Sequence, residues 1–343
     1  MIRASEISIV QSSRAAWIAG LVGLLLLLAL LAAPYWAGRA DMRLLSEIYL
    51  YLALACLWNI LAGYAGLVSV GQHAYVGLGG YMLFALAMFG GINPLVAIPL
   101  AGLIGGVASM LVAVLIFRLS GAYFAIGTWV VAETFRLSFA QVSALGGGSG
   151  TSLPAGIVTA IGDGRDGREA IIYWGSLGIA VLVLAAIFLL LRSRQGPALK
   201  AIRDNELAAR SLGIDIWRSK FIIYVGASTL TAMVGAAIFL QKLRISPDAA
   251  FSVNDWTAFV IFIVVIGGIG TLEGPIIGTI VFFLLRETLA DLGPSYQLIL
   301  GLVAIVVMLR APQGLWGFVR SHYRIELFPL TPRAIDSQSK KDI

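Results

Sequence analysis

The chain has 343 residues, of which 59% are apolar and only 12% are charged, and its mean hydropathy is +0.92. Soluble globular domains carry about 25% charged residues, so this composition excludes a soluble protein and indicates an all-α polytopic membrane protein. The basic residues behind the net charge of +6 cluster in loops between apolar segments, which indicates membrane topology rather than nucleic-acid binding. The single cysteine, Cys56, lies in an apolar segment and excludes an intrachain disulfide.

Apolar runs of roughly membrane-spanning length follow one another along the chain. We predict about ten transmembrane segments, and glycines around several of them favour broken or re-entrant helices. The predicted segments are 17–36, 44–61, 73–89, 94–117, 122–139, 171–191, 221–240, 256–269, 275–290 and 296–309. A signal peptide is the competing interpretation of the first run. That run is long for one and lacks a clear A-x-A site, so we interpret it as a retained span.

The distribution of Lys and Arg predicts the orientation of the chain. With the N-terminus inside, sixteen basic residues fall on the cytoplasmic side and seven on the outer side, as the positive-inside rule expects. This predicts a cytoplasmic N-terminus (1–15), a transmembrane permease domain (16–317) with a turn-rich outer loop (141–170), and a cytoplasmic polar tail (318–343). Five spans precede that loop and five follow it, which is compatible with two inverted halves.

The longest polar run between two apolar segments is residues 196–220, which we predict to lie in the cytoplasm. Gly196 and Pro197 form a break followed by a good helix start, apolar residues then recur at helical spacing, and Gly213 is a helix stop. The run therefore predicts a short amphipathic helix. It is either a docking site for a soluble partner or an ordinary basic loop.

Two stretches of the predicted membrane region contain polar residues. One stretch is rich in glycine and the other is an apolar span. Ser69 and Gly71 belong to a glycine-rich interruption at 59–73. It is either a broken helix beside a solute path, a glycine-rich cytoplasmic turn, or a set of small residues that lets helices pack closely. Tyr123, Thr128 and Glu133 give the fifth span a polar stripe. Glu133 can pair with Arg136 three residues later, so this stripe either lines the path or holds a structural ion pair.

The sequence contains no constellation expected of an enzyme. His73 and His322 have no Cys, His, Asp or Glu cluster nearby, so we expect no metal site, and no nucleophile–base set is visible. The P-loop pattern G-x-x-x-x-G-K-[ST] is absent, so we expect no ATP site or other cofactor in this chain. If the protein moves a solute uphill, the energy comes from a partner or from an ion gradient.

Several motifs in one order resemble a known family over most of the chain. They are NILAGYAGLVSVGQHAY (59–75), YFAIGTWVVAE (123–133), GPALKAIRDNELAARSLGI (196–214), SP (246–247) with Phe251, GGIGTLEGPIIG (267–278) and PQGLWG (312–317). The chain resembles the LivM-type permeases of branched-chain amino acid ABC importers. This resemblance implies a multi-pass bacterial inner-membrane protein that works with a second homologous permease, two ATP-binding subunits and a periplasmic solute-binding protein.

The resemblance also makes residues 196–220 similar to the E-A-A-x-x-x-G coupling loop of ABC importers. Ala208, Ala209 and Gly213 align with that pattern, but Leu207 takes the glutamate position and Glu206 lies one residue earlier. The implied ATPase-coupling residues are therefore Glu206, Ala208, Ala209 and Gly213. The resemblance implies branched-chain or related amino acids as the solute, and relatives with these motifs also carry urea or amides. The alternative is an ion-coupled secondary transporter of small polar solutes.

Overall fold

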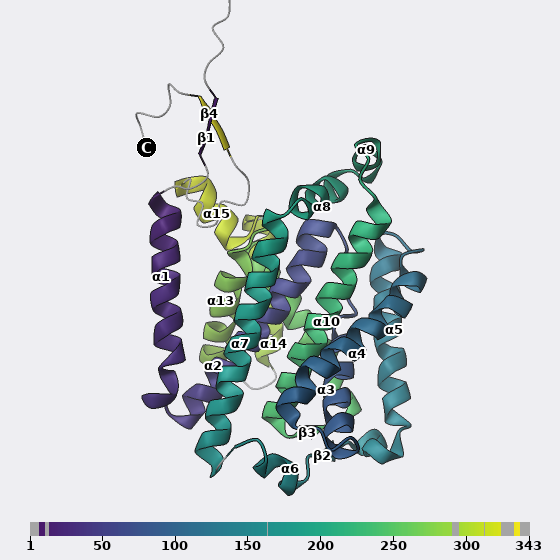
Figure 1. Cartoon of the computed structure of the whole chain (residues 1–343). Coiled ribbons are helices and arrows are strands. Elements are labelled where there is room, and N and C mark those ends of the chain that lie inside the picture. The colour runs from purple at the N-terminus through teal and green to yellow at the C-terminus, as the bar shows by residue number, and fades with distance from the viewer. Residues whose placement is uncertain are drawn as a thin grey trace, which may run out of the picture.

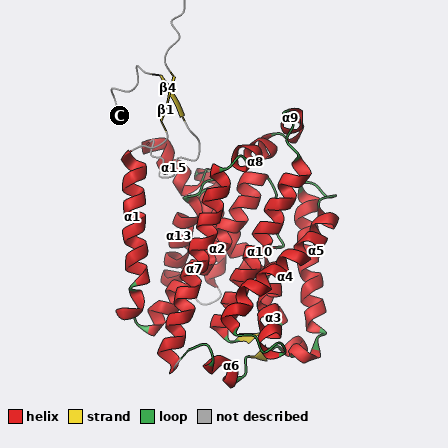
Figure 2. Cartoon of the chain, in the orientation of Figure 1, coloured by secondary structure: helices red, strands yellow, loops and turns green. Residues whose placement is uncertain are grey.

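The computed structural model (Figure 1) describes residues 7–10, 14–162, 164–289, 295–311, 313–323 and 333–336, and these residues are almost entirely helical (Figure 2). The helices are α1 (Arg14–Leu31), α2 (Arg39–Asn59), α3 (Gln72–Met88), α4 (Pro94–Ile116), α5 (Ala122–Ala140), α6 (Ala155–Thr159), α7 (Gly164–Arg192), α8 (Gln195–Asp204), α9 (Glu206–Ser211), α10 (Ile216–Lys242), α11 (Pro247–Ala250), α12 (Phe259–Gly267), α13 (Gly274–Leu289), α14 (Ser295–Arg310) and α15 (Gly314–Tyr323). Short 3-10 turns are η1 (Ala33–Tyr35), η3 (Ser143–Leu145) and η4 (Gly147–Ser149), and π-helical turns are η2 (Ile60–Tyr64) and η5 (Asn254–Ala258).

Among the described residues, six helical segments are long and apolar enough to cross a membrane. They are Arg39–Tyr64, Pro94–Ile116, Gly164–Arg192, Ile216–Lys242, Pro247–Gly267 and Gln297–Phe318, and each overlaps one of the ten predicted spans. The predicted spans 73–89 and 275–290 correspond to α3 and α13, which have only 17 and 16 residues because irregular backbone precedes each of them. The molecule is thus a polytopic helical membrane protein. The total of ten spans and the two inverted halves stay predictions.

Small residues bring the central helices into close contact. A Cβ atom added to Gly79 of α3 would lie 1.9 Å from the Ala232 carbonyl oxygen of α10, and one added to Gly106 of α4 would lie 2.3 Å from the Thr229 hydroxyl. Gly278 of α13 likewise lies against the carbonyl of Ile263 in α12. Membrane helices gain little from the hydrophobic effect and associate by such close packing. Gly79, Gly106 and Gly278 therefore allow α3, α4 and α13 to lie close to their neighbouring helices.

The two ends of the helical bundle carry different elements (Figure 1). At one end lie α8, α9 and α15, together with the antiparallel pair β1 (Ile7–Val10) and β4 (Arg333–Asp336), which come from the two terminal parts of the chain. At the other end, β2 (Thr151–Ser152) of the predicted outer loop pairs with β3 (Arg244–Ile245) after α10, beside α6. The predicted coupling segment and both described terminal strands therefore share one end, opposite the predicted outer loop.

Candidate functional site

Residues 196–220, predicted as one amphipathic helix, form two short helices, α8 and α9. The division is at Asn205, whose backbone is extended and whose side-chain oxygen accepts hydrogen bonds from the N–H groups of Leu207 (3.0 Å) and Ala208 (3.1 Å). An asparagine N-cap of this kind satisfies donors that have no partner within the helix. Gly213 follows α9 with a φ of +80°, so its predicted role as a helix stop is confirmed.

The four predicted coupling residues do not share one environment. Glu206, Ala208 and Gly213 are exposed, whereas Ala209 is buried. Ala209 belongs to a small apolar cluster with one isoleucine from α8 and one from α10. It therefore holds α9 in place rather than offering a surface to a partner.

Two large apolar side chains are exposed on the same segment. Leu207 is 76% exposed and Leu212 is 77% exposed, although the sequence groups both with the apolar face of a single helix. Exposed apolar surface is often covered by a partner, which makes these two leucines candidate docking residues. Beside them, Glu206 forms an ion pair with Lys220 of α10, which ties α9 to the start of that helix.

Arg203 connects α8 to the end of α2. Its Nη1 donates a 2.7 Å hydrogen bond to the carbonyl oxygen of Gly63, while Nε and Nη2 bind the Asp204 carboxylate at 3.0 and 2.9 Å. The Gly63 carbonyl lies in the π-helical turn η2, and the helix ends after Ala65, so no further helical N–H follows to bond this oxygen. The guanidinium thus binds the broken end of α2 directly.

The two glycine-rich stretches meet at this same point, although they lie more than 200 residues apart. The Asn59 amide accepts a 2.8 Å hydrogen bond from the N–H of Gly270 and donates a 2.7 Å bond to the carbonyl of Thr271. Gly270 has a φ of +75°, which favours glycine, and its backbone lies directly against Gly63. We call Asn59, Gly63, Arg203, Gly270 and Thr271 the coupling junction.

Replacing Gly63 by alanine is expected to lower the free energy of unfolding by about 1–3 kcal/mol, the usual cost of an added methyl group in a packed site. The new Cβ would lie 2.5 Å from the Gly270 nitrogen. The melting temperature of the detergent-purified chain measures this effect. Gly226→Ala on α10 is the matched control, since no atom lies within 4 Å of its Cβ position. Equal melting temperatures for the two variants would contradict the tight packing of the junction.

The residues predicted to line a path separate into two groups. Ser69, Gly71 and Thr128 are buried where the irregular stretch 66–71 packs on α5, and the Thr128 hydroxyl accepts a 3.1 Å hydrogen bond from the N–H of Val70. An added Cβ on Gly71 would lie 2.1 Å from the Thr128 carbonyl oxygen, so this contact is closed. Tyr123, by contrast, is 73% exposed on α5.

Glu133 lies at the partly exposed side of α5 in an ion-pair network. The predicted pair with Arg136 is present, with nitrogen–oxygen distances of 2.7 to 3.0 Å. Arg136 also binds Asp248 of α11 at 2.8 Å, which the sequence does not predict. Charges at membrane depth are costly unless they face a cavity, water or a protein partner. The network therefore indicates that this side of α5 does not face lipid alone.

A cavity of about 400 Å³ lies between the irregular stretch after η2, the start of α5 and the coupling segment. It is lined by residues 66–68 of the irregular stretch, by residues 120–122 before α5, and by Glu206 and Lys220 of the coupling segment. Both partners of the ion pair that ties α9 to α10 thus line this cavity. Among the described residues, no group of three His, Cys, Asp or Glu side chains is placed to hold a metal ion.

Sequence reasoning missed Arg203 and Asn59 as functional candidates. The signal for Asn59 is an amide within an apolar run just before glycines, because a polar group at membrane depth needs a protein partner. For Arg203 no local signal exists, since its partner Gly63 is 140 residues away in the sequence.

Comparison with known proteins adds to this geometry. A family model described as the permease component of branched-chain amino acid transport systems matches residues 42–309. The high-affinity branched-chain amino acid transport system permease proteins LivM of Salmonella typhimurium and Escherichia coli K12 are 26% and 27% identical over 323 residues, covering 88% of this chain and 76% of each relative. The ribose import permease RbsC of Escherichia coli K12 is 28% identical over 137 residues, which is 38% of this chain and 42% of that protein. No solved structure matches significantly.

Proposed function

Because the chain belongs to the family of branched-chain amino acid transport permeases, we propose that it is the membrane-spanning subunit of an ABC importer. In this proposal it moves branched-chain or related amino acids inward by alternating access. A second homologous permease completes the path, two partner subunits bind and hydrolyse ATP, and a periplasmic solute-binding protein delivers the solute. The chain itself binds no nucleotide, and it resides in a bacterial inner membrane.

The observation that carries the proposal is the joining of an exposed apolar surface to the coupling junction through α8 and α9. Leu207 and Leu212 are placed to dock an ATPase, and Arg203 lies on the adjoining helix. The predicted orientation puts this end of the bundle, with both terminal strands, in the cytoplasm, where ATP is available.

The junction suggests how ATP binding reaches the membrane. When the ATPases close, α8 and α9 move with them, and Arg203 pulls on the Gly63 carbonyl at the broken end of α2. Asn59 passes this displacement to Gly270 and Thr271 between α12 and α13. The irregular backbone after α2 and the irregular backbone between α12 and α13 then change conformation together, provided that ATP binding favours one conformation over the other. Broken helices suit this task because their backbone is not held by a continuous helical ladder.

The α5 network supports a second permease. Glu133 and Arg136 are only partly exposed, and Tyr123 lies on the same helix two to four turns away. A homologous subunit against α5 would shield these charges from lipid and place a polar surface beside the path.

Affinity purification of the detergent-solubilised chain from its native membrane, followed by mass spectrometry, tests the proposed composition. We expect a second permease and two nucleotide-binding proteins to co-purify in stoichiometric amounts. A chain that purifies alone under conditions that preserve other ABC complexes of the same membrane would contradict the proposal.

A further inference from the structure

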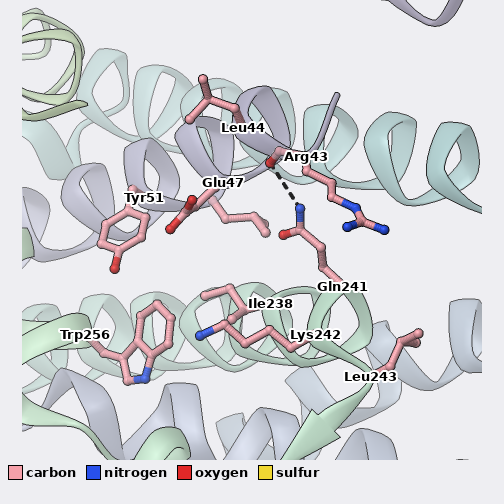
Figure 3. Close-up of a pocket in the computed structure, with 10 residues that line it drawn as sticks. Arg43, Leu44, Glu47, Tyr51, Ile238, Gln241, Lys242, Leu243 and Trp256 are labelled. Atoms are coloured by element: carbon pink, nitrogen blue, oxygen red, sulfur yellow. Dashed lines mark hydrogen bonds between the residues drawn. The ribbon is translucent and has the colours of Figure 1, made fainter. Parts of the chain in front are cut away.

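A second cavity, of about 540 Å³, lies between the first turns of α2 and the last turn of α10, at the end of the bundle opposite α8 and α9. Figure 3 shows Glu47 and Tyr51 of α2 facing Lys242 of α10 and Trp256 of η5 across it. Leu50 and Ile238 complete an apolar part of the wall. Small-molecule sites typically have about 300–1,000 Å³ and combine apolar walls with a few placed polar groups, so this cavity fits that class.

The charged side chains that line the cavity differ in whether they form an ion pair. The Glu47 carboxylate binds Arg286 of α13 through both oxygens, at 2.8 and 2.9 Å, and Arg43 forms an ion pair with Glu169 of α7. Lys242 differs, because within the described part of the chain no carboxylate lies at ion-pair distance from it. Its Nζ instead lies 4.6 Å from the centroid of the Trp256 ring. Glu47 and Asp255 act on this ammonium only from beyond ion-pair distance, so it can still pair directly with an anionic group of a ligand.

We propose that this cavity binds a zwitterionic α-amino acid with an apolar side chain. The ligand carboxylate pairs with Lys242, and its ammonium lies beside Glu47, whose oxygens retain acceptor capacity after binding Arg286. The apolar side chain packs against the edge of the contacting Tyr51 and Trp256 rings, beside Leu50 and Ile238. This inference rests on the proposed function for the identity of the solute and assigns its entry site within this chain.

The position of the cavity agrees with an entry site. It lies at the end of the bundle where the predicted outer loop is found, and therefore where a periplasmic protein would release its solute. Two of the elements that form its walls, α2 and η5, also lead to the coupling junction. Helix α2 carries Glu47 near its start and Asn59 at its end, and η5 continues through α12 to the stretch that contains Gly270. A shift at the junction would accordingly change the shape of the cavity.

The test is a binding measurement on the purified chain in nanodiscs of phosphatidylcholine, without ATP or partner subunits. Radiolabelled leucine is the probe, and leucinol, which lacks the carboxylate, is the competitor. We expect saturable leucine binding, with leucinol competing at least about tenfold more weakly, because a hydrogen bond to a charged group is lost. Lys242→Met should weaken leucine binding by about tenfold or more, since it keeps the apolar stem and removes the charge.

Arg244→Met is the matched control, because Arg244 is an exposed cation two residues away that does not line the cavity. Its leucine affinity should equal that of the wild type. Absence of saturable binding at millimolar leucine, or equal affinity in Lys242→Met, would overturn the site. Displacement of leucine by phosphatidylglycerol in the nanodisc, with the lipid effect lost in Lys242→Met, would instead assign the cavity to an anionic lipid headgroup. No ATPase takes part in this binding measurement. Its result therefore does not depend on whether the assembled transporter shows ATP-driven uptake.

Discussion

Replacing Leu207 and Leu212 together by aspartate is expected to weaken the binding of the ATP-binding partners by at least about 100-fold. Leu207 lies on α9 and Leu212 directly follows this helix, and both side chains are more than three-quarters exposed. Full burial of one leucine against a partner contributes about 1.5–3 kcal/mol, and the double variant loses this contribution at both positions and adds a desolvation cost for the two charges. The amount of ATP-binding subunit recovered with the purified chain measures the effect.

This double variant is also expected to fold normally, because neither leucine belongs to the buried cluster that holds α9. Its melting temperature as an isolated chain should match that of the wild type. Val142→Asp, which places a charge on an exposed apolar residue of the opposite end, is the control and should keep its partners. Recovery of both ATP-binding subunits with the double variant at wild-type yield would show that α9 is not the docking surface.

Arg203→Ala is expected to uncouple transport from ATP hydrolysis. The variant loses the hydrogen bond to the Gly63 carbonyl and leaves that buried oxygen without its donor, a change of about 1.5–3 kcal/mol for a charged group. Motion of α8 would then no longer reach the broken end of α2. We expect amino acid uptake per ATP hydrolysed to fall about tenfold or more, while assembly and ATP hydrolysis persist.

Two further variants separate coupling from a general structural effect. Arg203→Lys retains a donor that can reach Gly63, so it should recover part of the uptake. Arg218→Ala removes an exposed cation in the first turn of α10 and should leave the ratio of uptake to hydrolysis unchanged. If Arg203→Ala transports with the wild-type ratio, the contact with Gly63 does not carry the motion.

Local signals in the sequence predict much of the fold and part of the site. Long apolar runs predict six of the spans, and Gly213 predicts the end of α9. The three-residue spacing of Glu133 and Arg136 predicts their ion pair. Each of these features depends only on residues that are close together in the sequence. The division of 196–220 at Asn205 also has a local signal, since asparagine before Glu206 is a favourable N-cap. The apolar spacing obscures it, because a single helix explains that spacing equally well.

The coupling junction could not be predicted in the same way. Asn59 and Gly270 are 211 residues apart, and their contact depends on how α2, α12 and α13 pack in three dimensions. The same holds for Ser69 and Gly71, which are predicted to line a path: both are buried, and Gly71 lies directly against the Thr128 carbonyl. A polar residue in an apolar run predicts that a partner exists, but not which partner it is.

The most direct test of the proposed function is uptake into proteoliposomes that contain the chain with its co-purified partners and its solute-binding protein outside. Radiolabelled leucine should accumulate only when hydrolysable ATP is present on the side of α8 and α9. Ionophores that dissipate sodium and proton gradients should leave the rate unchanged. Accumulation without ATP that follows an imposed ion gradient would contradict the importer and identify an ion-coupled secondary transporter.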